Sequence, residues 1–188
     1  MKLQIQKSLC EEKLIDACIK NKSAAQKELF ERFSSKMFTI CLRYIKDASE
    51  AEDVLITGFM KVFEKLNQFQ FQGSFEGWIR KIIINEALGY IRQHKTLFLE
   101  VDIDRIDKGF LVPDSLEEED LLVMIQNLPI GYRTIFNLYA IEGYSHKEIA
   151  DLMGINENTS KSQLSRARTI LKKMLLEHEK QTRSIVKV

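Results

Sequence analysis

The segment "SHKEIADLMGINENTSKSQLSRAR" (145–168) decides how the C-terminal part of this chain folds. Ser145 can cap a helix, and Glu148, three residues later, can complete a capping box. Gly154 is typical of the left-handed residue that ends such a helix, and Asn156 can cap the next one. A short helix, a tight turn and a longer helix together predict a helix-turn-helix.

The second helix of this motif has two unlike faces. At 100° per residue, the inner face carries small and aliphatic side chains: Ser160, Leu164, Ala167, Leu171 and Leu175. The outer face carries hydroxyl, amide and basic side chains: Asn158, Thr159, Ser162, Ser165, Arg166, Thr169 and Lys173, with Lys161 and Arg168 at its edges. Such side chains reach base edges and phosphates in a DNA groove. An ordinary solvated helix face is the alternative interpretation.

Upstream, apolar residues recur with helical period, which predicts a bundle of three or four helices. The expected helices are a short one around 14–19, then 23–46, 50–66 and 75–94. Their apolar stripes include Leu29, Phe33, Met37, Cys41 and Tyr44 in the second helix, and Ala51, Val54, Leu55, Gly58, Phe59, Val62, Phe63 and Leu66 in the third. No segment has the pattern of a strand, so the fold class is all-α.

The distribution of charge indicates two domains. The 188 residues have a net charge of +1. Residues 1–95 carry 16 basic and 12 acidic side chains, 96–120 carry 2 and 9, and 121–188 carry 10 and 6. The acidic strip lacks helical period over 96–114, which predicts a solvated linker. Beyond it, Ser115 and Glu118 predict a capped helix. Pro129 either ends that helix or starts the next, and Gly143 predicts the end of a helix over 131–143.

Several function classes are excluded by what the chain contains. No apolar run approaches the roughly 18 residues of a membrane span, and the N-terminus does not resemble a secretion signal, so we expect a cytoplasmic protein. The cysteines and histidines do not have the spacing of a zinc site: Cys10, Cys18, Cys41, His94, His146 and His178. No nucleophile–base set or phosphate loop is recognisable, so neither an enzyme nor a cofactor is expected.

The helix over 75–94 adds a polar stripe. With Ile79, Ile82, Ile83 and Tyr90 facing inward, the opposite side would carry Lys81, Asn85, Leu88, Arg92 and Lys95. Glu86 falls on the apolar side without an explanation. Before this helix, Phe69, Phe71 and Phe75 lie in a polar loop, and aromatic rings beside basic groups suit unstacked bases. These phenylalanines, like Trp78, could instead complete the bundle core.

Three motifs in this order resemble a bacterial RNA polymerase sigma factor of the sigma-70 family, in its extracytoplasmic-function (ECF) group. The motifs are "EAEDVLITGFMKVFEKL" (50–66), "GSFEGWIRKIIINEALGYIR" (73–92) and "LPIGYRTIFNLYAIEGYSHKEIADLMGINENTSKSQLSRARTILKK" (128–173), within a resemblance over about 10–178. The implied domains are a region-2-like domain over 1–95, the linker over 96–114, a region-4-like domain over 115–180 and a tail over 181–188.

The resemblance implies a role for three groups of residues. Those that would bind core RNA polymerase are Asp53, Val54, Ile56, Thr57, Phe59, Met60 and Phe63. Those that would bind melted minus-10 DNA are Phe71, Gly73, Ser74, Phe75, Arg80, Lys81, Asn85 and Arg92. Those that would read minus-35 duplex DNA are Thr159, Lys161, Ser162, Ser165, Arg166 and Lys173.

The implied partners are the β′ clamp helices and β flap of core RNA polymerase, promoter DNA and an anti-sigma factor. Neither membrane insertion nor a small-molecule substrate is implied. The chain departs from the family's sequence pattern in two places. Ile56 and Thr57 replace the Gln and acid of many relatives, and Ser160 stands where Val is commoner.

We therefore predict a two-domain transcription initiation factor. The alternatives are a helix-turn-helix regulator that binds duplex DNA without polymerase, and a helical adaptor without a DNA role.

Overall fold

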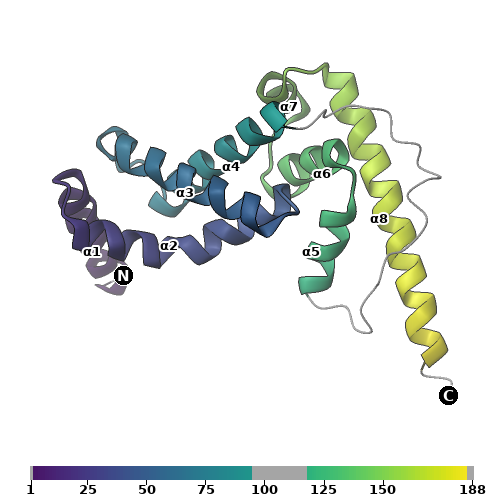
Figure 1. The fold of residues 1–188 in the computed structure, drawn as a ribbon, viewed down its shortest axis with the longest axis horizontal. Helices are drawn as coiled ribbons and strands as arrows, with labels where there is room; N and C mark the ends of the chain where they lie inside the picture. Colours follow the sequence, from purple (N-terminus) through teal and green to yellow (C-terminus); the bar gives the residue numbers. More distant parts are fainter. Residues whose placement is uncertain (1, 95–117, 186–188) are drawn as a thin grey trace. The chain divides into compact units, whose positions relative to one another are not determined.

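The structure is a computed structural model that describes the backbone of residues 2–94 and 118–185 and the side chains of 11–93 and 121–177. Every regular element within these ranges is helical, which confirms the all-α prediction (Figure 1). The chain divides into two compact units, Met1–Tyr90 and Ile91–Val188. The expected linker over 96–114, together with Ser115 and Lys95, lies outside the described residues.

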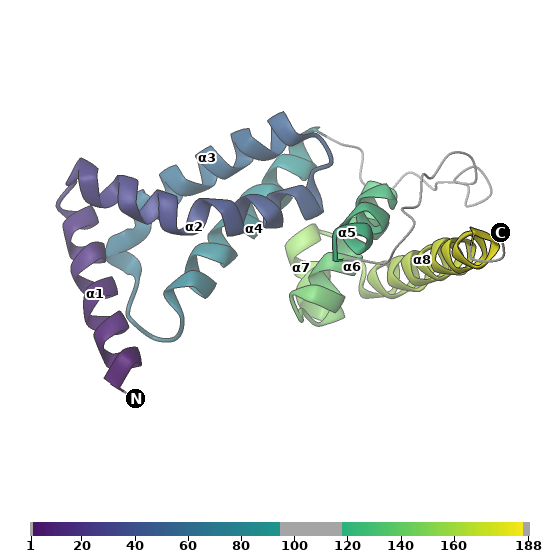
Figure 2. The same cartoon turned by 90° about the horizontal axis from the view of Figure 1, so that it is seen from below.

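The first unit contains a bundle of helices close to the predicted ranges. They are α1 (Lys2–Ile19), α2 (Ser23–Tyr44), α3 (Ala48–Lys65), the 3₁₀ turn η1 (Leu66–Gln68) and the start of α4 (Phe75–His94). The bounds of α4 match the prediction, whereas α1 is much longer than expected. Figure 2 shows α1 steeply inclined to α2 near the N-terminal end of α2. Asp47 starts α3 by accepting a hydrogen bond from the Glu50 backbone N–H at 3.0 Å.

The core of the first unit is built from the predicted stripes. All five stripe residues of α2, from Leu29 to Tyr44, are buried, and α3 buries its own face from Ala51 to Val62. The sequence left Glu86 on the apolar side of α4 unexplained. In the structure its carboxylate forms an ion pair with Lys61 of α3. The acid therefore links two helices at the edge of the core.

The second unit contains the helix-turn-helix. Its elements are α5 (Glu118–Asn127), α6 (Ile130–Phe136), the π turn η3 (Asn137–Ile141), α7 (His146–Met153) and α8 (Glu157–Ile185). Pro129 precedes α6 as its N-cap, which settles whether it ends one helix or begins the next. The helix expected over 131–143 is interrupted by the π turn and is followed by Gly143, whose φ is +79°. α8 continues to Ile185, into the segment expected as a tail.

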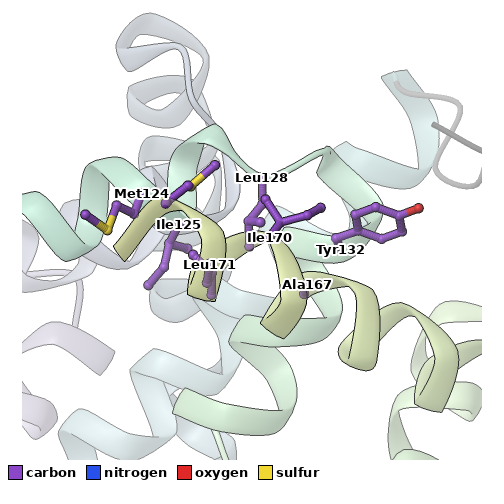
Figure 3. Packing of buried hydrophobic residues seen from close by; sticks show 8 residues of the cluster. Met124, Ile125, Leu128, Tyr132, Ala167, Ile170 and Leu171 are labelled. Carbon is purple, nitrogen blue, oxygen red and sulfur yellow. The ribbon is translucent and has the colours of Figure 1, made fainter. Parts of the chain in front are cut away.

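The core of the second unit lies between α5, α6 and α8. Figure 3 shows side chains from the three helices meeting along the side of α8. The cluster consists of Met124, Ile125, Leu128, Tyr132, Ala167, Ile170, Leu171 and Met174. Because these contacts extend over two turns of α8, they fix the rotation of that helix about its axis. No helix in the described part of the chain has both the length and the apolar character needed to cross a membrane.

Gly58 lets α3 and α4 approach closely. A Cβ atom at this position would lie 2.5 Å from Cδ1 of Ile83, which is fully buried. The other two nearest atoms, also of Ile83, would be at 3.7 and 3.8 Å, which is ordinary van der Waals contact. The glycine costs α3 up to about 1 kcal/mol of helix stability. Glycine avoids the collision that a side chain at this position would make with Ile83 of α4.

A double-mutant cycle tests this contact. We expect Gly58→Ala alone to destabilise the first unit, because overpacking costs about 1–3 kcal/mol and the gain in helix propensity offsets only part of it. Ile83→Val removes Cδ1, the one atom in the way. The double variant should lose less free energy of unfolding than the two single variants lose in sum, by at least about 1 kcal/mol. Urea unfolding followed by the fluorescence of Trp78, the single tryptophan, measures each variant.

Gly89→Ala in α4 is the control, because no neighbouring atom lies within 4 Å of its Cβ position. This variant should stabilise the first unit by up to about 1 kcal/mol. Additive effects of Gly58→Ala and Ile83→Val would show that the two residues do not collide.

Candidate nucleic-acid interface

The turn between α7 and α8 forms by the local rules that its sequence indicates. The Ser145 hydroxyl accepts a hydrogen bond from the Glu148 N–H at 3.3 Å, and the Glu148 carboxylate accepts one from the Ser145 N–H at 2.8 Å. Gly154 ends α7 in the left-handed conformation, with φ of +66°. Asn156 Oδ1 then accepts a hydrogen bond from the Asn158 N–H at 2.8 Å. The predicted capping box, stop and cap are all confirmed.

The inner face of α8 is buried as predicted and is wider than predicted. Ser160, Leu164, Ala167 and Leu171 are buried, and Leu175 is half-buried. The prediction omitted three residues that are also buried: Gln163, Ile170 and Met174. The omission of Ile170 and Met174 was a failure to follow the apolar pattern around the helix. Gln163 gave no such signal, because it is polar and is buried only by its place in the fold.

The outer face of α8 is exposed along its first four turns except at Thr159, which is half-buried. Its centre carries Asn158, Ser162, Ser165 and Thr169. By helical angle, Arg166 and Lys173 follow one edge of this centre, whereas Lys161, Arg168 and Lys172 follow the other, and all five are exposed. Lys161 also pairs with Glu157 at 2.7 Å, and this ion pair lowers the pKa of the Glu157 carboxyl. The face is therefore a hydroxyl-rich strip between two basic edges.

A pocket lies beside one basic edge, and sequence reasoning missed it. Its volume is about 340 Å³, and it is lined by His146 of α7 and by a set of α8 residues: Lys161, Leu164, Ser165, Arg168, Thr169 and Lys172. The only hint in the sequence was that five of these six α8 residues are polar and recur with spacings of three and four. His146, from a different helix, could not be assigned to them by spacing.

The side chain of His146 is held in place by its neighbours. Its Nδ1 lies 2.9 Å from the Ser160 hydroxyl, and its ring stacks on Tyr139 with centroids 4.5 Å apart. The Arg168 guanidinium carbon lies 5.7 Å from the centroid of the same tyrosine ring. Burial lowers the pKa of His146, and the positive charges of Lys161 and Arg168 lower it further, against the opposing effect of Glu157.

In α4, the predicted polar stripe is present with one correction. The side chains of Lys81, Asn85 and Arg92 are exposed, and Arg80 is half-buried. Leu88 was expected on this face, but it is only 1% exposed and belongs to the core. The prediction centred the inner face on Ile79, Ile82, Ile83 and Tyr90. Of these, Ile79 and Ile83 are buried, but Ile82 and Tyr90 are half-buried, and the true centre lies nearer Ala87.

The loop before α4 presents one aromatic ring on top of a cluster of others. Phe71 is 51% exposed, and its ring centroid lies 5.0 Å from that of Phe69. Phe69 in turn contacts Phe75 and Trp78, with centroids 5.0 and 5.5 Å away. Phe71 has a φ of +56°, a conformation that non-glycine residues adopt at a cost and that often marks functional positions.

Two small residues shape the rest of this loop. Gly73 has a φ of +89° and nothing within 4 Å of its Cβ position. The Ser74 hydroxyl accepts a hydrogen bond from the Gly77 N–H at 3.3 Å, which caps the start of α4. Both residues are exposed. The sequence-based alternative, that these phenylalanines complete the core, is true of Phe69 and Phe75 but not of Phe71.

On α3, the residues expected to bind polymerase divide into two sets. Asp53, Ile56, Thr57 and Met60 are exposed, with Ile56 at 48% and Met60 at 59%, and Phe63 is half-buried. The Thr57 hydroxyl donates to the Asp53 carbonyl at 2.9 Å, so the polar group at this position is satisfied within the helix. The exposed set therefore presents mainly apolar surface.

Three expected contact residues are buried and need correction. Val54 and Phe59 of α3 and Phe75 of α4 are at most 3% exposed. Phe59 packs edge-on against Phe30, and Phe75 packs edge-on against Phe33. A side chain enclosed in this way supports the surface above it and cannot itself touch a partner. The sequence motif includes these residues because the fold needs them.

Comparisons with known proteins support one family. Residues 29–96 match the model of "Sigma-70 region 2", and residues 118–171 match that of "Sigma-70, region 4". The ECF RNA polymerase sigma factor SigE of Mycolicibacterium smegmatis is 28% identical over 163 residues, which cover 82% of this chain and 63% of that protein. The ECF RNA polymerase sigma factor SigM of Bacillus subtilis is 28% identical over 153 residues, covering 77% of this chain and 91% of that protein.

Among solved structures, the fold is similar to the sigma factor RpoE in complex with the anti-sigma factor NepR from Bartonella quintana. The TM-score is 0.49 and the identity 20%, over 79% of this chain and 95% of that chain. The two family models together match more than half of this chain, in the order in which the two helical units occur. The chain therefore belongs to the sigma-70 family of RNA polymerase sigma factors, in the ECF group, and is a non-catalytic transcription initiation factor.

Proposed function

We propose that this sigma factor reads minus-35 duplex DNA with α8 and captures melted minus-10 DNA with α4 and the loop before it, while α3 binds core polymerase. The domains that would do this are residues 1–95 and 115–180, joined by the acidic segment 96–114. The observation that carries the proposal is that each unit has an exposed polar helix face backed by a buried apolar one. Such a face is free to meet a partner without unfolding the core.

For the minus-35 element, the proposed readers are on the outer face of α8. They are Thr159, Lys161, Ser162, Ser165, Arg166 and Lys173. A hydroxyl-rich strip between basic edges suits a helix in the major groove, where base edges lie at the centre and phosphates on both sides. Lys161 contributes through its charge, since its amine already contacts Glu157.

For the minus-10 element, the proposed contact surface combines Phe71 with the polar stripe of α4. Phe71 would stack on an unstacked base, Asn85 would face the strand, and Lys81 and Arg92 would hold phosphates. Arg80, Gly73 and Ser74 border this surface. Unstacking a base costs a few kcal/mol, and stacking on an aromatic ring returns about 1–3 kcal/mol per base. The positive φ of Phe71 and the 51% exposure of its side chain support this role, because such backbone conformations cluster at functional positions and the ring is accessible without DNA.

For core polymerase, the proposed contact surface is the exposed face of α3. It comprises Asp53, Ile56, Thr57, Met60 and Phe63. Ile56 replaces a polar residue of many relatives, so we infer that binding to the β′ clamp helices depends here more on apolar burial than on hydrogen bonds. The β flap is the second polymerase contact that family membership implies.

We further propose that the protein works in the cytoplasm and is held inactive by an anti-sigma factor. The support for the anti-sigma partner is the ECF resemblance, and the exposed apolar and basic faces described above are the surfaces that such a partner would cover. Neither membrane insertion nor a small-molecule substrate is part of the proposal.

Run-off transcription with core polymerase on a genomic fragment library would identify the promoter, and absence of specific initiation would contradict the whole proposal.

The first residue-level prediction concerns base reading by Arg166. On the promoter found by run-off transcription, Arg166→Ala should cost about 1–3 kcal/mol of binding to the minus-35 duplex, because a paired guanidinium–base contact is lost. Discrimination at one base pair should be lost with it. Fluorescence anisotropy on duplexes with single base-pair changes measures both. Arg168→Ala is the matched control, expected to weaken all duplexes alike. If Arg166→Ala weakens binding to all duplexes equally, Arg166 contacts a phosphate and not a base.

The second concerns promoter opening. Phe71→Ala should slow opening by about fivefold or more, because stacking worth about 1–3 kcal/mol is removed. Binding to the minus-35 duplex should be unchanged. Opening is followed by the fluorescence of 2-aminopurine in the minus-10 element with core polymerase present. Phe71→Trp keeps a stacking surface and should open nearly as fast as the parent protein. If Phe71→Ala opens the promoter as fast as the parent protein does, Phe71 does not stack on a base.

The third concerns core polymerase. Met60→Ala should weaken binding to core polymerase about tenfold, since a side chain of this size contributes roughly 1.5–3 kcal/mol when fully buried. Competition against a labelled sigma factor measures the affinity. Ile19→Ala is the control, because Ile19 is a similarly exposed aliphatic residue, on α1. Equal affinities of the two variants would remove Met60 from the interface.

A further inference from the structure

Tyr139 belongs to none of the surfaces proposed above, yet it contacts both helices of the helix-turn-helix. It lies in the π turn η3, which is closed by a hydrogen bond from the Glu142 N–H to the Asn137 carbonyl at 2.9 Å. Its ring stacks on that of His146 in α7, with centroids 4.5 Å apart and planes inclined by 23°. The guanidinium carbon of Arg168 in α8 lies over the same ring, 5.7 Å from its centroid. Turns of the π type are frequent at functional sites.

These contacts form a path that starts and ends on α8. Ser160, which is fully buried, has its hydroxyl 2.9 Å from Nδ1 of His146. His146 stacks on Tyr139, and Arg168 lies over Tyr139. The eight residues from Ser160 to Arg168 amount to two helical turns and about 80°. The path therefore runs from the inner face of α8 to the edge of its outer face, and its buried end holds the ring that Arg168 contacts.

The ring restricts a side chain that would otherwise be mobile. Arg168 is exposed, and an unrestrained arginine side chain has a large rotamer entropy. A guanidinium within about 6 Å of the centre of a tyrosine ring is attracted to its face. The attraction does not depend on a hydrogen bond, and among the described residues Arg168 has neither a hydrogen bond nor an ion pair. Its N–H donors are thus available to a partner.

Lys161, on the same edge of the outer face, is held in a different way. Its amine pairs with the Glu157 carboxylate at 2.7 Å, which offsets its charge. The ring of Tyr139 is uncharged, so it restrains Arg168 without neutralising it. Of these two cations, Arg168 therefore combines a restrained position with an uncompensated charge.

We propose that Tyr139 is a positioning residue for DNA binding, which holds Arg168 in the conformation that meets the DNA backbone beside the minus-35 element. A side chain that already has its bound conformation loses less conformational entropy when the partner arrives. Tyr139 touches no DNA and acts only through Arg168. The contact of Arg168 with DNA rests on the proposed function, whereas the restraint of Arg168 by Tyr139 does not.

The size of the effect follows from the contact between cation and ring. At an exposed site, such a contact favours the restrained conformation by a factor of about two to five. If the binding-competent conformation becomes rarer by this factor, the apparent affinity falls by the same factor. Tyr139→Leu should therefore weaken binding to the minus-35 duplex about two- to fivefold. The loss should be the same for duplexes that differ in sequence, because backbone contacts carry no sequence information.

The first test is a double-mutant cycle, measured with the full chain by fluorescence anisotropy on the minus-35 duplex. The variants are Tyr139→Leu, Arg168→Ala and the two combined. Because Tyr139 acts through Arg168, Tyr139→Leu should have little effect on affinity once Arg168→Ala is present. Tyr139→Phe keeps the ring and should bind within about twofold of the parent protein. Phe136→Leu is the matched control, because it removes a ring that packs against the core and should not change the affinity.

The second test follows Arg168 by NMR in the absence of DNA. Its Nε–Hε signal is assigned from the spectrum of Arg168→Ala, and ¹⁵N relaxation measures how mobile the side chain is. In Tyr139→Leu we expect this signal to become more mobile and to lose the shift caused by the ring. In Tyr139→Phe and Phe136→Leu it should resemble that of the parent protein. The backbone amide signals show whether each variant is folded.

Three results would overturn the proposal. If Tyr139→Leu weakens binding equally with and without Arg168→Ala, Tyr139 supports the fold and does not position Arg168. If Tyr139→Leu binds as well as the parent protein or better, DNA does not meet Arg168 in the restrained conformation. If the Arg168 signal is the same in Tyr139→Leu, the ring does not hold it.

The two tests also separate this inference from the proposed function. If the parent protein does not bind the duplex at all, the proposed function fails, and the NMR test still decides whether Tyr139 restrains Arg168. If the parent protein binds and the effects of Tyr139→Leu and Arg168→Ala are additive, the positioning role fails alone.

Discussion

Burial of one side of α8 is the constraint on which the proposed minus-35 surface depends. Ser160 and Ala167 have no exposed surface, and Ile170 and Leu171 pack into the core with α5 and α6. Because an α-helix turns by 100° per residue, burying these positions commits the hydroxyl-rich strip to the opposite side. Ser160 also contacts His146, so the residue that departs from the commoner valine links the core to the basic pocket.

A comparable constraint organises the first unit. The absence of a side chain at Gly58 lets α3 and α4 meet at Ile83, and the Lys61–Glu86 ion pair joins the same helices at the edge of the core. With their apolar sides committed to each other and to α2, the two helices turn separate faces outward. One of these faces is the proposed polymerase surface and the other is the proposed minus-10 DNA surface, and both depend on the same packing.

Most elements of the fold could be predicted because their signals are local, whereas several site residues could not. The prediction for Leu88 failed because α4 contains three consecutive isoleucines, and only two of them, Ile83 and Ile84, are fully buried. Helical period alone fits several rotations of such a helix, and only the neighbouring helices select one. Likewise, Phe71 and Phe75 belong to one motif, yet one ring is exposed and the other buried.

By itself, the sequence determined where most helices begin and end and that the chain is a sigma factor, since caps, stops and motifs depend on residues a few positions apart. Only the tertiary structure decided which motif residues reach solvent and which support them from below. It also brought together His146 of α7, Tyr139 of η3, and Ser160 and Arg168 of α8. The physical reason is that pocket shape and pKa depend on distances in space, which helix packing sets and sequence spacing does not.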